Sequence, residues 1–316
     1  MEHDPRILKH EQQIEALRNK LPDWIKRLQR PPTPALIPKF GPLEGVRVVS
    51  TGVFIAEPYI GTKLGEFGAE VIHVERPSGD TFRVTAPFLN RGPRAHGCDE
   101  AEVGKNKLSM GVDLRTARGI ELLMALWKIS DVWMESSAPG TMERAGLSNE
   151  LALAINPSLV IVRVSTYGQY GEQEYLGRPG YDAVAQAFGG MMSVTGDPSG
   201  PPQRAKVYTG DYLTALTGWA ATMMALWQVK KTGQGQVIDL AQYEAVAQTQ
   251  GNCMPLYTGQ GGLYGHPGLI WRGAPSIGED TTDILVKMLN LSSAEIEHSY
   301  RGTVVHRTEP FTPVCG

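Results

Sequence analysis

The stretch GVRVVSTGVFIAEPYIGTKLGEFGAEVIHV, residues 45–74, decides the fold class. Its hydrophobic pattern predicts a short buried strand over Val46–Val49 and a helix over Pro58–Phe67 that ends at Gly68. A second apolar strand is predicted over Val71–Val74. A strand, a helix and a strand in this order predict a βαβ unit, whose two strands lie parallel.

The same alternation continues toward the C-terminus. Further strands are predicted over 107–114, 131–134, 159–164 and 237–240, and further helices over 117–127, 149–155, 181–188 and 213–229. This order predicts an α/β fold, a Rossmann-like and mostly parallel sheet with helices on both faces. Ligands of such sheets bind beyond the carboxyl ends of the strands, so the loops after Val49, Val74, Met134 and Val164 are the candidates.

Composition and charge exclude several classes of protein. The 316 residues carry 30 basic and 33 acidic side chains, which argues against nucleic-acid binding through bulk charge. No apolar run reaches the ~18 residues of a membrane span, and the N-terminus has no apolar signal core, so a cytoplasmic protein is expected. The three cysteines are far apart and form no zinc-binding spacing, so no metal site is predicted.

Four segments are predicted along the chain. Residues 1–38 form an N-terminal helical arm, interrupted at Pro22, and a proline-rich linker. Residues 39–258 form the large domain, 259–268 a glycine-rich connector, and 269–316 a C-terminal helical tail. The arm is expected to pack on its own domain or on a partner subunit.

The sequence lacks GxGxxG after a strand, GxxxxGK[ST] and GxSxG, so a dinucleotide fingerprint, a phosphate loop and a nucleophile elbow are not indicated. It contains, in this order, GAEVIHVERPSGD (68–80), NKLSMGVDL (106–114), PGTMERAGLS (139–148), RPGYDAVAQAFGG (178–190), TGDYLTAL (209–216) and TGQGQVIDLAQYEA (232–245). Together these stretches resemble the class III CoA-transferase family, which includes formyl-CoA transferase and carnitine CoA-transferase.

The carnitine CoA-transferase branch resembles the chain most, through KFGPLEGVRVV (39–49), GQYGEQEY (168–175) and IWRGAPSIGEDTTDIL (270–285). The family implies a large nucleotide-binding-like domain, a smaller second domain and a homodimer of two interlocked chains. In this chain the glycine-rich connector runs almost directly into the tail. The second domain is therefore expected to be missing.

The resemblance implies that Asp211 is the catalytic nucleophile. An aspartate of ordinary pKa, ~3.9, is ionised at pH 7 and attacks a thioester carbonyl without a base. The resulting mixed anhydride is attacked by the released CoA thiolate, which leaves an aspartyl-CoA thioester, and an acceptor acid reverses the steps. Without the resemblance, an aspartate between a glycine and a long helix is most often a helix cap.

CoA and its acyl-CoA are implied as substrates, with no permanently bound cofactor. The cations that CoA phosphates need are assigned to arginines at strand ends, and the remaining contacts to residues near the reactive centre. The implied binding residues are Phe54, Ala56, Arg76, Arg115, Arg144, Arg178 and Tyr181.

The expected function is transfer of CoA from an acyl-CoA to a free carboxylic acid, such as carnitine or a betaine-like acid. One alternative is a truncated, non-catalytic CoA-binding subunit. Another is an acyl-CoA racemase, but that branch of the family has a histidine where this chain has Tyr181.

Overall fold

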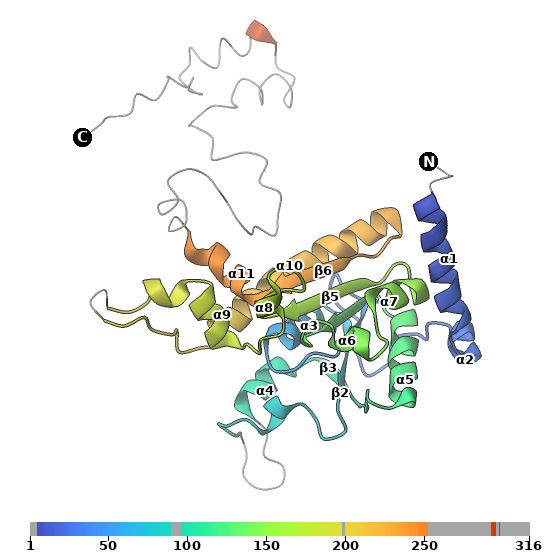
Figure 1. Ribbon diagram of the computed structural model, residues 1–316, viewed down its shortest axis with the longest axis horizontal. Helices are drawn as coiled ribbons and strands as arrows, with labels where there is room; N and C mark the ends of the chain where they lie inside the picture. The colour runs from blue at the N-terminus through green and yellow to red at the C-terminus, as the bar shows by residue number, and fades with distance from the viewer. Residues whose placement is uncertain (1–4, 90–96, 198–199, 252–291, 295–296, 298–316) are drawn as a thin grey trace. The chain divides into compact units, whose positions relative to one another are not determined.

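The computed structural model describes residues 5–89, 97–197, 200–251, 292–294 and 297. The chain divides into two units, residues 1–262 and 263–316, and each helix and strand named below belongs to the first (Figure 1). The predicted connector of 259–268 lies outside the described residues, as does the predicted tail of 269–316 except for 292–294 and 297.

Six strands of the described chain form one sheet in the order β3-β2-β1-β4-β5-β6. Their bounds are β1 Arg47–Ser50, β2 Glu70–Glu75, β3 Lys107–Gly111, β4 Val132–Glu135, β5 Val160–Ser165 and β6 Val237–Ala241. Every neighbouring pair is parallel, with Val49 opposite Ile72 on one side and Trp133 on the other. The predicted α/β fold is confirmed, and the sheet is parallel throughout.

The helices of the described chain are α1 Pro5–Asn19, α2 Asp23–Arg27, α3 Ala56–Glu66, α4 Cys98–Val103, α5 Ala117–Lys128, α6 Thr141–Arg144, α7 Asn149–Ile155, α8 Gln173–Leu176, α9 Asp182–Phe188, α10 Thr209–Thr232 and α11 Gln242–Ala247. Successive strand residues point to opposite faces, so Val48 packs with α3 and α10 whereas Val49 packs with α5 and α7. Two apolar cores therefore cover the two faces of the sheet.

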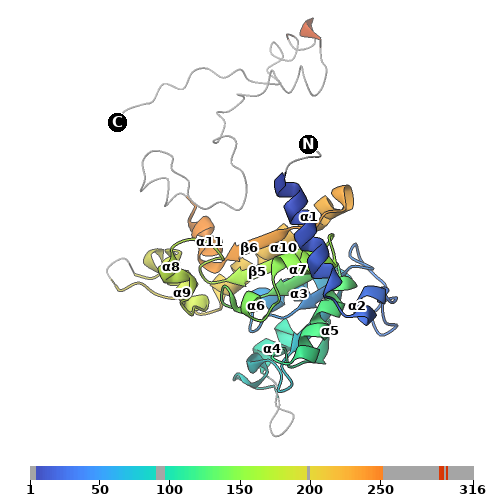
Figure 2. The same cartoon turned by 45° about the vertical axis from the view of Figure 1, so that its right-hand side comes forward.

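The N-terminal arm packs on its own domain. α1 lies beside α7 and α2 beside α5, with the break between them at Pro22 (Figure 2). Arg18 donates through Nε to the carbonyl oxygen of Ala154 at 2.7 Å, and Arg30 binds both carboxylate oxygens of Asp131 at 2.8 Å. These contacts attach the arm to the domain that carries the sheet.

The strand order reverses between β1 and β4, because the chain moves from β1 outward to β3 and then returns to the other side of β1. The loop after β1 and the loop after β4 therefore leave the sheet in opposite directions. In open parallel sheets this divergence creates the crevice where ligands bind. The fold thus places the candidate site at the carboxyl ends of these two central strands.

Candidate active site

A cleft of about 210 Å³ lies at this reversal of strand order. Its walls come from residues 53–56 after β1, 136–139 after β4, 164–167 at the end of β5 and the 176–181 segment before α9. Asp211 of α10 and Gln242 of α11 also line it. Segments that are far apart in the chain converge here because parallel strands end at one edge of the sheet.

Asp211 lies in the first turn of α10 and is 8% exposed. Its backbone amide and that of Gly210 donate to Oδ1 of Asp182, at 3.3 and 2.7 Å. Asp182 of α9 therefore caps α10, and the interpretation of Asp211 as a helix cap is wrong. Glycine at position 210 favours this close approach, because a β-carbon would lie 3.2 Å from both the carbonyl and the carboxylate oxygen of Asp182, a tight contact.

The side chain of Asp211 is oriented by Gln242. The Gln242 amide donates through Nε2 to Oδ1 of Asp211 at 2.6 Å. The hydroxyl of Thr166, at the end of β5, donates to Oε1 of Gln242 at 2.9 Å and so fixes which end of the amide faces Asp211. Sequence reasoning missed Gln242 and Thr166, because only the pairing of β6 with β5 brings them together.

The surroundings of Asp211 raise its pKa to about 7. Burial is the main cause and the charge of Asp182 adds to it, while the hydrogen bond from Gln242 acts in the opposite direction. An aspartate with this pKa is about half ionised at pH 7. The expectation that Asp211 is fully ionised without help is therefore corrected by the fold.

Aromatic side chains form the rim of the cleft beside its β1 wall. The ring of Phe54 packs against those of Phe82 and Tyr181, with centroids 5.6 and 5.5 Å apart. Tyr181 is 63% exposed, whereas Ala56 is buried at the start of α3. Both line the cleft together with Phe54, so three of the predicted binding residues meet there.

Arg178 also lines the cleft. Its guanidinium binds the carboxylate of Glu174 and lies 4.8 Å from the ring centroid of Tyr175. Because Arg178 is paired with Glu174, its positive charge at the cleft is partly neutralised.

A second groove of about 840 Å³ lies at the carboxyl ends of β2 and β3 and contains Arg76 and Arg115. Arg76 donates through Nε to the carbonyl of Gly79 at 2.9 Å, and Arg115 binds both carboxylate oxygens of Asp113 at 2.9 Å. Val53 lines both the groove and the cleft, so the two cavities adjoin at the loop after β1.

Arg144 lies apart from the other predicted arginines. It is exposed on α6, donates to the hydroxyl of Thr141 at 3.0 Å, and is not among the residues that line the cleft or the groove. Within the described ranges, no cluster of three potential metal ligands occurs, and no helix is long and apolar enough to cross a membrane.

Residues 43–276 match CoA-transferase family III, and the chain belongs to this family. It is 42% identical over 212 residues to the bile acid CoA-transferase BaiK of Clostridium scindens, an alignment that covers 67% of this chain and 46% of the relative. It is 37% identical over 230 residues to the succinyl-CoA–D-citramalate CoA-transferase of Chloroflexus aurantiacus. This alignment covers 72% of this chain and 54% of the relative. The chain thus spans about half the length of these curated relatives.

Solved structures show the same fold. A CAIB/BAIF family protein from Brucella suis superposes with a TM-score of 0.66 at 28% identity, over 84% of this chain and 76% of that one. Rv3272 from Mycobacterium tuberculosis superposes with a TM-score of 0.62 at 29% identity, over 70% of this chain and 61% of that one. The resemblance seen in the sequence to the class III family is confirmed.

Proposed function

We propose that this chain transfers CoA between an acyl-CoA and a free carboxylic acid through a covalent intermediate on Asp211. The observation that carries the proposal is the buried carboxylate of Asp211 on the wall of the central cleft, held by a hydrogen bond from Gln242. Family membership supports the same chemistry.

In the proposed reaction, an oxygen of the Asp211 carboxylate attacks the thioester carbonyl, and the carbon–sulfur bond breaks to release the CoA thiolate. The thiolate then attacks the aspartyl carbonyl of the mixed anhydride, forms a thioester with Asp211 and releases the acyl group as its carboxylate. The acceptor carboxylate repeats these two steps in reverse. Each step exchanges one acyl bond for another, so the overall reaction needs no oxidant or reductant.

The two adjoining cavities suit different parts of the CoA molecule. The groove with Arg76 and Arg115 suits the phosphates, because guanidinium groups bind phosphate oxygens strongly. The thioester would reach the cleft past Val53 and lie beside Phe54, Ala56 and Asp211. Arg144 and Arg178 are proposed as further contacts outside the groove.

The proposed acceptor is a carnitine-like or betaine-like acid. The aromatic rings of Phe54 and Tyr181 line the cleft and suit a quaternary ammonium group, which aromatic rings attract. The names of the two relatives point to other acids, a bile acid and D-citramalate. Transfer assays with carnitine, cholate and citramalate as competing acceptors will rank these three classes.

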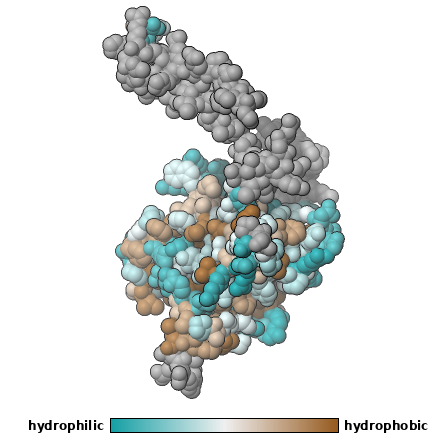
Figure 3. Space-filling model, turned by 90° about the vertical axis from the view of Figure 1, so that its left-hand side faces the viewer, coloured by the Kyte–Doolittle hydropathy of each residue, from teal (hydrophilic) through white to brown (hydrophobic). Residues whose placement is uncertain are grey.

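A homodimer in the cytoplasm is proposed as the working form. Large apolar residues are exposed on the side of α8 and α9, where Figure 3 shows them interspersed with hydrophilic ones. Tyr170 and Phe188 there are 77% and 48% exposed, and exposed apolar area is typical of subunit contacts. Sedimentation at several concentrations tests this, and a monomer throughout would contradict it.

The decisive experiment is intact-mass measurement after mixing the protein with succinyl-CoA or acetyl-CoA. We expect a gain of one CoA minus one water, with Asp211 as the modified residue after proteolysis. Asp211→Asn keeps the shape of the side chain and should form no adduct, whereas the matched surface variant Asp23→Asn should behave as wild type. CoA binding without an adduct would favour the non-catalytic CoA-binding subunit, and exchange of the proton α to the thioester without an adduct would favour a racemase.

A further inference from the structure

The backbone of Phe54 has an unusual conformation at the cleft wall. Its φ is 65°, in the left-handed region that side chains other than glycine seldom occupy, and Asn106 is the other described non-glycine residue with positive φ. A bulky residue persists in this region only when its surroundings hold it there. Phe54 therefore requires a group that holds its backbone in this conformation.

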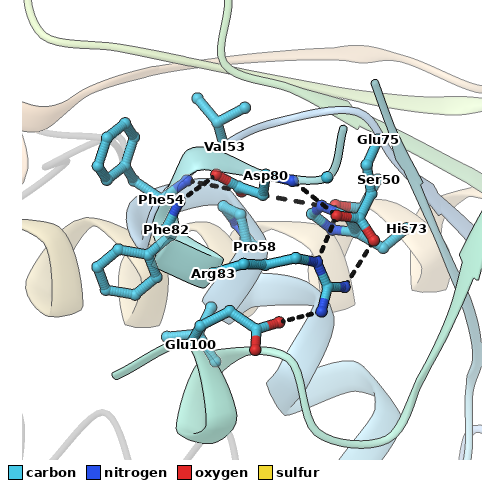
Figure 4. A network of polar contacts seen from close by, with 12 residues as sticks. Ser50, Val53, Phe54, Pro58, His73, Glu75, Asp80, Phe82, Arg83 and Glu100 are labelled. Carbon is cyan, nitrogen blue, oxygen red and sulfur yellow. Dashed lines mark hydrogen bonds and ion pairs between the residues drawn. The ribbon is translucent and has the colours of Figure 1, made fainter. Parts of the chain in front are cut away.

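Asp80 supplies that group from the loop after β2. Its carboxylate is buried and accepts the amide of Phe54 through Oδ2 at 3.1 Å and the amide of Phe82 through Oδ1 at 2.9 Å. Figure 4 shows the carboxylate between these two backbones, with the two rings on the same side. One aspartate therefore fixes both members of the Phe54–Phe82 ring pair.

Asp80 is itself anchored by the network behind it. Its amide donates to Oε2 of Glu75 at 2.8 Å, and Glu75 also accepts two hydrogen bonds from Arg83, at 2.7 and 2.6 Å (Figure 4). Nε2 of His73 lies 3.9 Å from Oδ2 of Asp80. The carboxylate thus has a fixed position relative to the sheet.

Packing leaves unfilled space beside the Phe54 loop, while the neighbouring Val53 amide donates to Oγ of Ser136 at 3.1 Å. A small cavity of about 40 Å³ lies behind the wall and is lined by Phe54, Asp80 and Lys107 among other residues. Because this space is not filled by side chains, the loop has room to relax if its hydrogen bond to Asp80 is lost. The ring of Phe54, which touches Tyr181 at the cleft, would move with it.

We propose that Asp80 is a positioning residue: through the Phe54 amide it fixes the aromatic wall against which the acyl thioester is aligned for attack by Asp211. The inference rests on the proposed function of Asp211. Asp80 lines the adjoining groove but not the cleft, so its effect on the geometry of attack by Asp211 passes through Phe54.

Two variants isolate the contact. Asp80→Asn keeps an oxygen for the Phe82 amide but turns an NH₂ group toward the Phe54 amide, where donor faces donor. Asp80→Ser also keeps a cap for Phe82 but is too short to reach Phe54. If one of the two variants does not fold, the other still tests the contact with Phe54. Asp23→Asn is the matched surface control.

The measurement is the rate of adduct formation as a function of acetyl-CoA concentration. We expect the limiting rate to fall by about 10- to 100-fold, because a misaligned reacting group costs rate rather than affinity. The half-saturating concentration should not rise by more than about threefold, since Asp80 is an acidic residue of the groove lining and its replacement removes no cation from the proposed phosphate site. In a Phe54→Gly background, where φ of 65° is no longer strained, Asp80→Asn should have little further effect.

The proposal is overturned if Asp80→Asn and Asp80→Ser keep the wild-type limiting rate, or if the loss is equally large with glycine at position 54. Hydrogen exchange of the amides in residues 51–56 gives a test that needs no catalysis. We expect faster exchange there in both variants and not in Asp23→Asn. If wild type forms no adduct, the proposed function fails, while unchanged exchange in the variants rejects the positioning role separately.

Discussion

The side-chain amide of Gln242 lies 2.6 Å from the carboxylate of Asp211, and the two residues are 31 positions apart in the chain. The backbone amide of Asp211 donates to Asp182, and the pKa of Asp211 is raised mainly by burial and further by the negative charge of Asp182. The carboxylate thus has one neighbour that favours its ionised form and one that opposes it. The balance sets the pH range in which a nucleophile is available.

Adduct formation should depend on pH near neutrality. Burial and Asp182 raise the pKa of Asp211 to about 7, and the attacking form is the carboxylate, so the rate should rise about tenfold from pH 6 to pH 8 and then level off. Asp182→Asn removes the neighbouring charge and should move the midpoint to lower pH. Stopped reactions analysed by mass at each pH measure this. A wild-type rate that is flat from pH 6 to 8 would contradict the prediction.

Replacing Gln242 should have the opposite effect. Gln242→Met keeps a similar volume but removes the donor to Asp211, so the pKa of Asp211 should rise further and the adduct rate at pH 7 should fall about tenfold. The loss should shrink as pH increases, because a high enough pH restores the carboxylate. Gln234→Met, in the exposed turn before β6, is the matched control. A loss that is equal at all pH values would show that Gln242 acts in another way.

The groove arginines should contribute to CoA affinity. We expect Arg76→Ala and Arg115→Ala each to weaken CoA binding about tenfold, because each removes a cation from the proposed phosphate site. Arg144→Ala, measured beside them, tests the proposed contact outside the groove. Isothermal titration with CoA gives the dissociation constants. Arg118→Ala, on α5 and paired with Glu121, should leave affinity unchanged, and equal affinities across all four variants would reject the site.

The Glu75 carboxylate behind the cleft should contribute pH-dependent stability. Burial alone would raise its pKa, but hydrogen bonds from Arg83, Ser109 and the Asp80 amide lower it to about 2. Because the folded-state pKa is below the unfolded value, the stabilisation is complete above about pH 4.5 and is lost as pH falls toward 2. Glu75→Gln should therefore lower the free energy of unfolding at pH 7 by about 3 kcal/mol.

The free energy of unfolding of Glu75→Gln should also depend less on pH than that of wild type at low pH. Between pH 5 and pH 3, wild type should lose about 2 kcal/mol more than Glu75→Gln, since only wild type has the titrating group. Urea unfolding followed by circular dichroism at each pH measures the difference. Parallel curves for the two proteins would show that Glu75 does not keep its low pKa. Glu174→Gln, on an exposed carboxylate, controls for a general effect of charge.

The sequence by itself determined the six strands and the longer helices between them, whereas the short helices α4, α6, α8 and α11 were not predicted. Buried strands such as β5 and amphipathic helices such as α5 leave a periodic apolar pattern that depends only on local geometry. Glycine and proline marked the ends, as at Gly68 and Pro22. The motif around Asp211 also stands in the sequence, so the family and the proposed nucleophile could be inferred without coordinates.

Only the tertiary structure decided what surrounds Asp211. The contacts from Asp182 and Gln242 span 29 and 31 residues, and the one from Asp80 to Phe54 spans 26. Such pairs meet because neighbouring parallel strands end at one edge of the sheet, which brings together the segments after β1 and β2 and those after β5 and β6. Burial, the pKa of Asp211 and the conformation of Phe54 follow from that convergence. A local pattern cannot encode them, because each depends on groups that are neighbours only after the sheet has formed.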